Sequence, residues 1–184
     1  MKRLLNNIIP LCVVLMGCGV SIERVSTQQE LLMGGFDPKE WKVRHQRGDQ
    51  NQGIIEYVRS DDKIDNWTEL LTIQTLKKPA VPEPIDTYTN MREIYGELSK
   101  RCPTIDWNMI KRQLPTETME ASILHEWKTP NCPPKAAQHG IGRIIYGKFS
   151  IFRLVYVAKT QALAPEKRDK TIKEFSEARI AVRE

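Results

Sequence analysis

The chain has 184 residues, of which 40% are hydrophobic and 7% are aromatic, and it carries 28 Lys and Arg against 23 Asp and Glu. This composition suffices for one packed domain and excludes a largely disordered chain. No apolar run reaches the roughly 18–20 residues that a transmembrane helix needs. Basic residues alternate with acidic ones instead of forming one stripe, so we expect no nucleic-acid partner.

The first 17 residues have the pattern of a bacterial export signal. A basic start precedes a short apolar stretch, and Leu15-Met16-Gly17-Cys18 follows. This run resembles the lipobox of bacterial lipoproteins, in which a small residue precedes the cysteine that receives lipid. The resemblance implies cleavage before Cys18, acyl chains on Cys18 and, because Gly19 is not Asp, an outer-membrane location facing the periplasm. A secretory signal cleaved elsewhere, or an uncleaved anchor, is the alternative.

Two cysteines remain once the signal and Cys18 are set aside. Cys102 and Cys132 lie in an oxidising compartment if the chain is exported, and thiols there form disulfides. We therefore predict a Cys102–Cys132 disulfide, which closes a loop of about 30 residues and stabilises the fold by about 3–4 kcal/mol. A redox or nucleophilic role is the alternative, but neither cysteine belongs to a C-x-x-C motif.

The mature chain divides into a tether and one domain. Residues 18–35 are mostly polar and end in two glycines, which is typical of a tether, although a short helix is the alternative there. Residues 36–184 form the domain. Alternating apolar and polar residues predict strands beginning near Trp41, Ile54 and Trp67. Short polar turns between these strands indicate an antiparallel meander.

A proline-rich segment follows the third predicted strand. Its prolines exclude a helix and a central strand from Lys77 to Pro84, so we predict a crossing loop there. Apolar residues at positions i, i+3, i+4 and i+7 then predict a helix from about Thr87 to Arg101. Pro103 ends that helix. A short strand or a sheet edge is predicted from Trp107 to Leu114.

Further strands and a closing helix are predicted in the second half. Alternation from Met119 to Trp127 indicates a strand, and a long loop from Thr129 to Gly140 follows it. Two more strands are predicted around Ile141–Phe149 and Ile151–Thr160. A helix then begins at Pro165, since proline fits a first helical turn.

This order of elements indicates an α+β fold, with a curved antiparallel sheet of about six strands and two main helices packed on it. Two runs of strands, separated and followed by helices, resemble the PsbP/Mog1-like fold. The resemblance covers most of residues 36–180 and rests on the order of the elements. Members of that fold are mostly accessory and binding proteins, so the resemblance implies a binding role and no catalytic residue.

Candidate catalytic and metal-binding residues are few. His125-Glu126 begins like the zinc motif H-E-x-x-H, but Thr129 stands where the second histidine belongs. On a strand, His125 and Glu126 also point to opposite faces of the sheet. A zinc site of His125, Cys132 and His139 would need a free Cys132 thiol, which the predicted disulfide removes. We therefore predict no metal and no cofactor.

We expect a non-catalytic lipoprotein domain that is anchored in the membrane and binds a protein or envelope partner, in an accessory or assembly role. Loops on a rigid scaffold commonly carry function, so the two proline-rich loops are the expected contact surfaces. Their candidate residues are Lys77, Lys78, Pro79, Pro82, Pro84, Pro130, Lys135 and His139. One alternative is an envelope hydrolase that uses His125, Glu126 or His139. The other is a small-molecule or lipid carrier with an apolar cavity of roughly 300 Å³ or more.

Overall fold

A computed structural model describes residues 29–34, 36–78, 95–96, 99–100, 102–130 and 137–183 of the chain. Several residues singled out above lie outside this part: Cys18, Pro79, Pro82, Pro84, Cys132 and Lys135.

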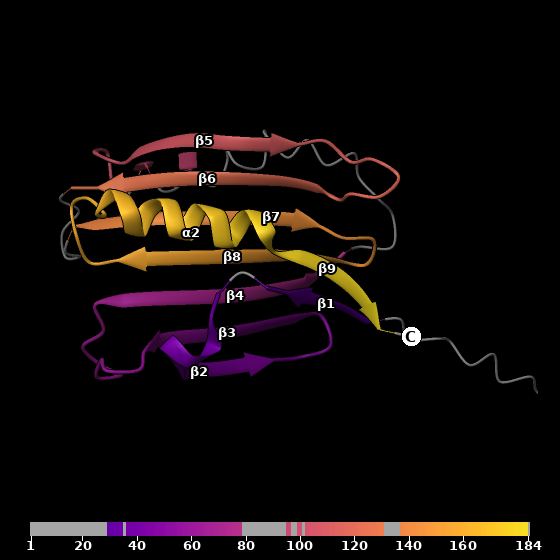
Figure 1. Ribbon diagram of the computed structural model, residues 1–184, viewed down its shortest axis with the longest axis horizontal. Helices are drawn as coiled ribbons and strands as arrows, with labels where there is room; N and C mark the ends of the chain where they lie inside the picture. Colours follow the sequence, from indigo (N-terminus) through magenta and orange to yellow (C-terminus); the bar gives the residue numbers. More distant parts are fainter. Residues whose placement is uncertain are drawn as a thin grey trace, which may run out of the picture.

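A seven-stranded antiparallel sheet forms the body of the molecule (Figure 1). Its strands lie in the order β2-β3-β4-β8-β7-β6-β5, so the two runs of strands meet where β8 pairs with β4. A 3-10 turn, η1 (Pro38–Glu40), leads into β2, the first strand of this sheet in chain order. The strand bounds are β2 Trp41–Gly48, β3 Gln52–Arg59, β4 Glu69–Lys77, β5 Asp106–Gln113, β6 Ala121–Thr129, β7 Gln138–Tyr146 and β8 Ser150–Ala158.

The alternation of side chains along each strand divides the core into two layers. On β8, Phe152, Leu154 and Tyr156 are buried, whereas the residues between them are only half-buried. Because successive side chains on a strand point to opposite faces, these three lie on one face of the sheet. They belong to the larger apolar cluster, which covers that face from β4 to β6. A second cluster on the other face is built around Tyr95, Ile123, Ile144 and Tyr146.

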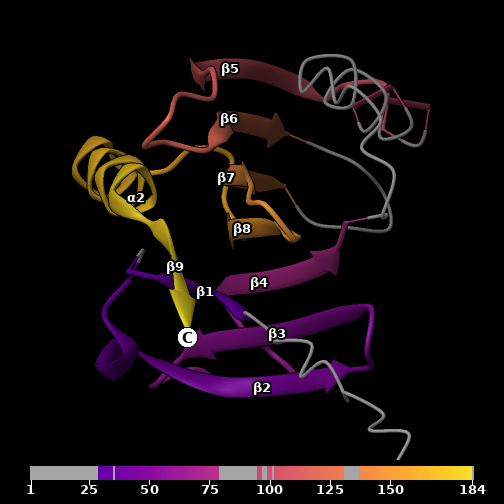
Figure 2. The ribbon, with the colours of Figure 1, turned by 90° about the vertical axis from the view of Figure 1, so that its right-hand side faces the viewer.

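One helix and a two-stranded ribbon cover the first face (Figure 2). Helix α2 (Pro165–Glu177) begins at the predicted proline and packs Phe175 into the larger cluster. Strands β1 (Gln29–Met33) and β9 (Arg179–Arg183) pair antiparallel as a separate ribbon, and Leu32 and Ile180 pack against the same cluster. No helix in the described part of the chain is long and apolar enough to cross a bilayer.

The predicted α+β fold class is wrong. The described residues are mostly β, with nine strands and one long helix, instead of about six strands and two main helices. The helix predicted over residues 87–101 lies mostly outside the described residues; Tyr95, Gly96, Ser99 and Lys100 are described and are helical. Strand β1 occupies residues that the sequence places in the tether, because its partner β9 lies at the other end of the chain and no local pattern marks the pairing.

Candidate functional site

His125 lies on the second face of the sheet, within a group of aromatic rings. Its Nδ1 is 2.6 Å from the Tyr95 hydroxyl, and its ring stacks on Trp127 with centroids 5.6 Å apart. Tyr95 itself stacks on Trp107 at 4.6 Å. Burial lowers the pKa of His125 to about 4, so the ring is neutral at physiological pH. Burial raises the pKa of Tyr95, so its hydroxyl keeps its proton and donates it to Nδ1.

Two glycines on β7 make room for these rings. Gly142 is the register partner of His125, and a Cβ at this position would lie 2.5 Å from the imidazole. Gly140 is the register partner of Trp127, and a Cβ there would overlap the indole ring. The rings therefore lie flat over the β7 backbone. His125 is a packing residue in this arrangement.

Glu126 is the next residue after His125 on strand β6, so its side chain points to the opposite face of the sheet. There its carboxylate is hydrogen-bonded to His139 and Arg168. Arg168 of α2 donates from Nε and Nη2 to the two Glu126 oxygens, at 2.7 and 2.8 Å. The Arg168 guanidinium, together with the hydrogen bond from His139, lowers the pKa of Glu126 to about 2 despite burial. This bidentate pair ties α2 to β6.

His139 is only 1% exposed, and both of its ring nitrogens are occupied. The Leu163 N–H donates to Nδ1 at 2.8 Å, so the proton of the neutral ring resides on Nε2. Nε2 lies 2.6 Å from Glu126 Oε1 and donates to it. Burial lowers the pKa of His139, which favours this neutral form. The prediction that His139 contacts a partner is wrong, because its side chain is buried in the fold.

The two histidines do not converge. His139 pairs with Lys128, which is three residues from His125 on β6. An odd separation places the two rings on opposite faces, in addition to about 10 Å along the strand. The hydrolase hypothesis requires them in one cleft with Glu126, and this geometry separates them. Within the described residues, no three His, Cys, Asp or Glu side chains gather as a metal site would require.

Arg143 is a structural residue that the sequence reasoning missed. It is 8% exposed on β7, and its Nη1 donates to the Phe175, Ser176 and Ala178 carbonyls at 2.5, 2.9 and 2.7 Å. A cation at the carboxyl end of a helix interacts favourably with the helix dipole and pairs its last carbonyls. An arginine inside the apolar run from Ile141 to Ile145 is the signal that could have pointed to this role.

Cys102 is buried, and its thiol forms no disulfide with any residue that the structure describes. Its Sγ lies 3.7 Å from the Thr104 hydroxyl. Cys132 lies outside the described residues, so the Cys102–Cys132 disulfide stays a prediction.

The interior beneath α2 is filled with side chains. A small pocket between α2 and the first strands measures about 20 Å³, which is room for about one water molecule. It lies against Tyr156. This space is much smaller than the apolar cavity of roughly 300 Å³ that the carrier hypothesis requires.

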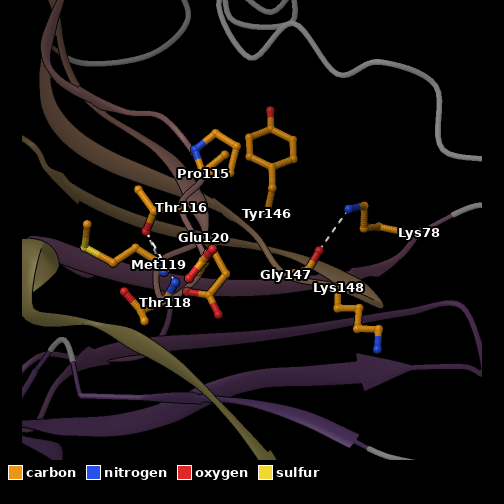
Figure 3. Close-up of a pocket in the computed structure, with 11 residues that line it drawn as sticks. Lys78, Pro115, Thr116, Thr118, Met119, Glu120, Tyr146, Gly147 and Lys148 are labelled. Carbon is orange, nitrogen blue, oxygen red and sulfur yellow. Dashed lines mark hydrogen bonds between the residues drawn. The ribbon is translucent and has the colours of Figure 1, made fainter.

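An open groove of about 400 Å³ lies at one end of the sheet, between the β5–β6 turn and the β7–β8 turn (Figure 3). Lys78 borders it and donates from Nζ to the Gly147 carbonyl at 2.9 Å. The Thr116 hydroxyl accepts the Met119 N–H at 3.1 Å and shapes the first turn. We call this site the groove; its lining residues are Lys78, Pro115, Thr116, Glu117, Thr118, Met119, Glu120, Ala121, Tyr146, Gly147 and Lys148.

One exposed apolar side chain lines the groove, and two more are the sequence neighbours of lining residues. Leu114 is 63% exposed, Met119 49% and Phe149 38%. Tyr146 and Lys148 leave the β7–β8 turn in opposite directions (Figure 3). An open cleft with apolar side chains at its rim is a common feature of binding sites.

The described residues that flank the two loops predicted to bind a partner lie at opposite ends of the sheet. Lys77 pairs with Ser150, whereas His139 pairs with Ala158, eight residues further along β8. That separation is about 27 Å along the strand. Lys78 remains at the groove and Lys77 beside it, whereas exposed Pro130 lies at the far end. The β5–β6 turn, which the sequence did not single out, supplies most of the groove.

Comparison with known protein families finds no matching family, and comparison with curated proteins finds no matching sequence. The lipobox and the likeness to the PsbP/Mog1-like fold therefore stay predictions from the sequence.

Proposed function

We propose that this chain is a lipid-anchored envelope protein whose folded domain binds a partner protein in the groove and catalyses no reaction. The groove carries the proposal, because it is a hollow at the surface with exposed apolar residues at its rim. The side chains with catalytic potential also support the proposal, because they are engaged in the fold. His125, Glu126 and His139 all have partners within the fold.

The lining of the groove suits a polypeptide segment. Met119 offers an apolar contact, and the turn backbones around it offer hydrogen-bonding groups. Lys78 and Glu117 contribute charges of opposite sign to the lining, which fits the mixed chemistry of a protein segment better than that of a polyanion. We infer that an apolar side chain of the partner sits against Met119.

The anchor rests on Leu15-Met16-Gly17-Cys18. Acyl chains on Cys18 would hold the domain at the membrane, since each buried methylene contributes about 0.8 kcal/mol and more than one chain makes anchoring stable. On the resemblance to lipoproteins, we propose the outer membrane and the periplasm as the location. The domain would then meet its partner within the cell envelope.

Site-specific photo-crosslinking in cells tests the groove. A photoreactive residue replaces Met119, and a matched control replaces Ile64, which is 44% exposed in the β3–β4 loop at the other end of the sheet. We expect a discrete protein adduct from position 119 and none from position 64. Leu114→Glu, at the rim of the groove, should reduce that adduct. Equal adducts from both positions, or none from position 119, would contradict the proposal.

A further inference from the structure

The outer face of the β1–β9 ribbon exposes an apolar strip. Leu32 and Ile180 are register partners that turn inward to the core. Because strand side chains alternate, Leu31 and Met33 turn outward, and they are 41% and 48% exposed. The register partner of Met33 is Arg179, which is exposed as well. The strip is therefore apolar along its length and cationic at its margin.

The β7–β8 turn is fixed beside this ribbon by Glu30. The Glu30 carboxylate accepts the backbone N–H groups of Lys148, Phe149 and Ser150, at 2.6, 3.0 and 2.7 Å. A Cβ at Gly147 would collide with the same carboxylate, at 2.6 Å, so the turn fits closely over it. Glu30 is 9% exposed, and both of its oxygens accept hydrogen bonds. Its negative charge is thus withdrawn from the surface.

The β7–β8 turn, which Glu30 holds beside the ribbon, carries another cation and another apolar side chain. Phe149 is 38% exposed, and the exposed Lys148 places its Nζ 5.1 Å from the centre of the Phe149 ring. Figure 1 shows β9 running toward the same end of the sheet as the β7–β8 turn. Apolar side chains flanked by lysine and arginine match the chemistry of an anionic phospholipid surface, whose phosphates attract cations.

The length of the chain before β1 points to the same occupant. Gln29 is eleven residues after Cys18. Eleven residues span at most about 40 Å, so a lipid on Cys18 would keep β1 within that distance of the bilayer. A tether this short raises the effective concentration of the membrane at the ribbon to the millimolar range, and a weak surface contact then suffices.

We propose that the outer face of the β1–β9 ribbon, together with Lys148 and Phe149, rests on the anionic phospholipid surface of the anchoring membrane. The proposal rests on the lipid anchor of the proposed function, because that anchor keeps the ribbon close to the membrane. Leu31, Met33 and Phe149 enter the interface between headgroups and acyl chains, and Lys148 and Arg179 pair with phosphates. The groove, which the same β7–β8 turn borders, then opens close to the bilayer. The partner it meets there lies at the membrane surface.

The test uses the full mature chain from residue 18 with Cys18→Ser, so that no lipid anchor contributes. Co-sedimentation is measured with vesicles of phosphatidylcholine alone and with vesicles that also contain phosphatidylglycerol. We expect binding that requires phosphatidylglycerol and weakens as salt rises. Lys148→Gln and Arg179→Gln should each lower the partition coefficient about fivefold, the equivalent of about 1 kcal/mol for each cation at a membrane surface.

Lys63→Gln is the matched control, because Lys63 is exposed in the β3–β4 loop at the opposite end of the sheet. It should leave the partition coefficient unchanged. Met33→Asn should weaken binding without altering the circular dichroism spectrum, since its side chain is exposed. Equal binding to both kinds of vesicle, or an equal loss with Lys63→Gln, would overturn the proposal.

The vesicle experiment and the detection of lipid on Cys18 can fail independently, so the ribbon contact and the lipid anchor are tested separately. A lipidated Cys18 in cells with no vesicle binding by the unlipidated chain would leave the anchor standing and overturn the ribbon contact. Vesicle binding by a protein whose Cys18 carries no lipid in cells would support the ribbon contact and overturn the anchor.

Discussion

Two regions of the sheet use their side chains in opposite ways. On β6 and β7, His125, Glu126, His139 and Arg143 are all less than 9% exposed, and each is hydrogen-bonded within the fold. At the end that carries the groove, Met119, Glu117 and Lys148 are exposed to solvent. The histidine, glutamate and arginine side chains therefore stabilise the fold, whereas the groove residues are available to bind a partner. Residue type alone would have assigned these roles the other way round.

The largest effect is expected from removing the buried guanidinium. Arg143→Met leaves the last carbonyls of α2 without their donor, and hydrogen bonds to a charged group contribute about 1.5–3 kcal/mol each. We expect the free energy of unfolding, measured by urea titration with circular dichroism, to fall by about 3 kcal/mol or more. Met119→Glu, in the groove, should change it by less than about 0.5 kcal/mol. Similar losses for both variants would break the comparison between the two regions.

An intermediate effect is expected where the aromatic rings lie on β7. Gly140→Ala places a methyl group against the Trp127 ring, and overpacking of this kind costs about 1–3 kcal/mol. Gly53→Ala, on β3, meets no atom within 4 Å and serves as the matched control. It should leave stability unchanged to within about 1 kcal/mol. Thermal unfolding of both variants measures the difference; a Gly140→Ala protein as stable as Gly53→Ala would contradict the packing role of these glycines.

A smaller effect is expected from pH. Burial lowers the pKa of His125 from 6.5 to about 4, so the unfolded chain binds a proton more readily than the folded one. Stability is therefore fully present above pH 6.5 and is lost as the pH falls toward 4. Between pH 6.5 and 5, this histidine should lower the free energy of unfolding by up to about 2 kcal/mol. His139, whose pKa is also lowered by burial, acts in the same direction.

The His125→Gln protein should show a shallower fall over this range. His45→Gln, at an exposed position of β2, should keep the fall of the unaltered protein. Glu126 adds a second loss at lower pH, because its folded pKa of about 2 lies below the ordinary 4.5. Its contribution is present above pH 4.5 and disappears as the pH drops toward 2. Urea titrations across pH 7 to 3 measure both losses; a flat profile would show that these groups are not buried as described.

Local patterns predicted much of the sheet. The alternation from Met119 to Trp127 predicted β6, and it correctly placed His125 and Glu126 on opposite faces. Pro165 marked the start of α2. A strand with one buried face imposes a period of two on its own sequence, and a proline fits a first helical turn, so both signals are local.

Long-range features were not predictable in this way. The β1–β9 pairing joins distant segments of five residues each, and such strands are too short for a distinctive alternation. Missing these strands contributed to the wrong fold class, because the described residues are mostly β. The groove was missed because the β5–β6 turn becomes its wall only when β7 and β8 fold beside it. Arg143 was missed because its partners are carbonyls, which no sequence pattern reveals.

Intact-mass measurement of the protein extracted from membranes, before and after reduction, tests the central claim most directly. The account predicts the mass of a chain that begins at Cys18 and carries acyl chains. It also predicts a gain of two hydrogen atoms on reduction, from the Cys102–Cys132 disulfide. A chain that retains residues 1–17, or one without lipid on Cys18, would contradict the claim that this is a lipid-anchored binding domain. No gain on reduction would remove the disulfide alone.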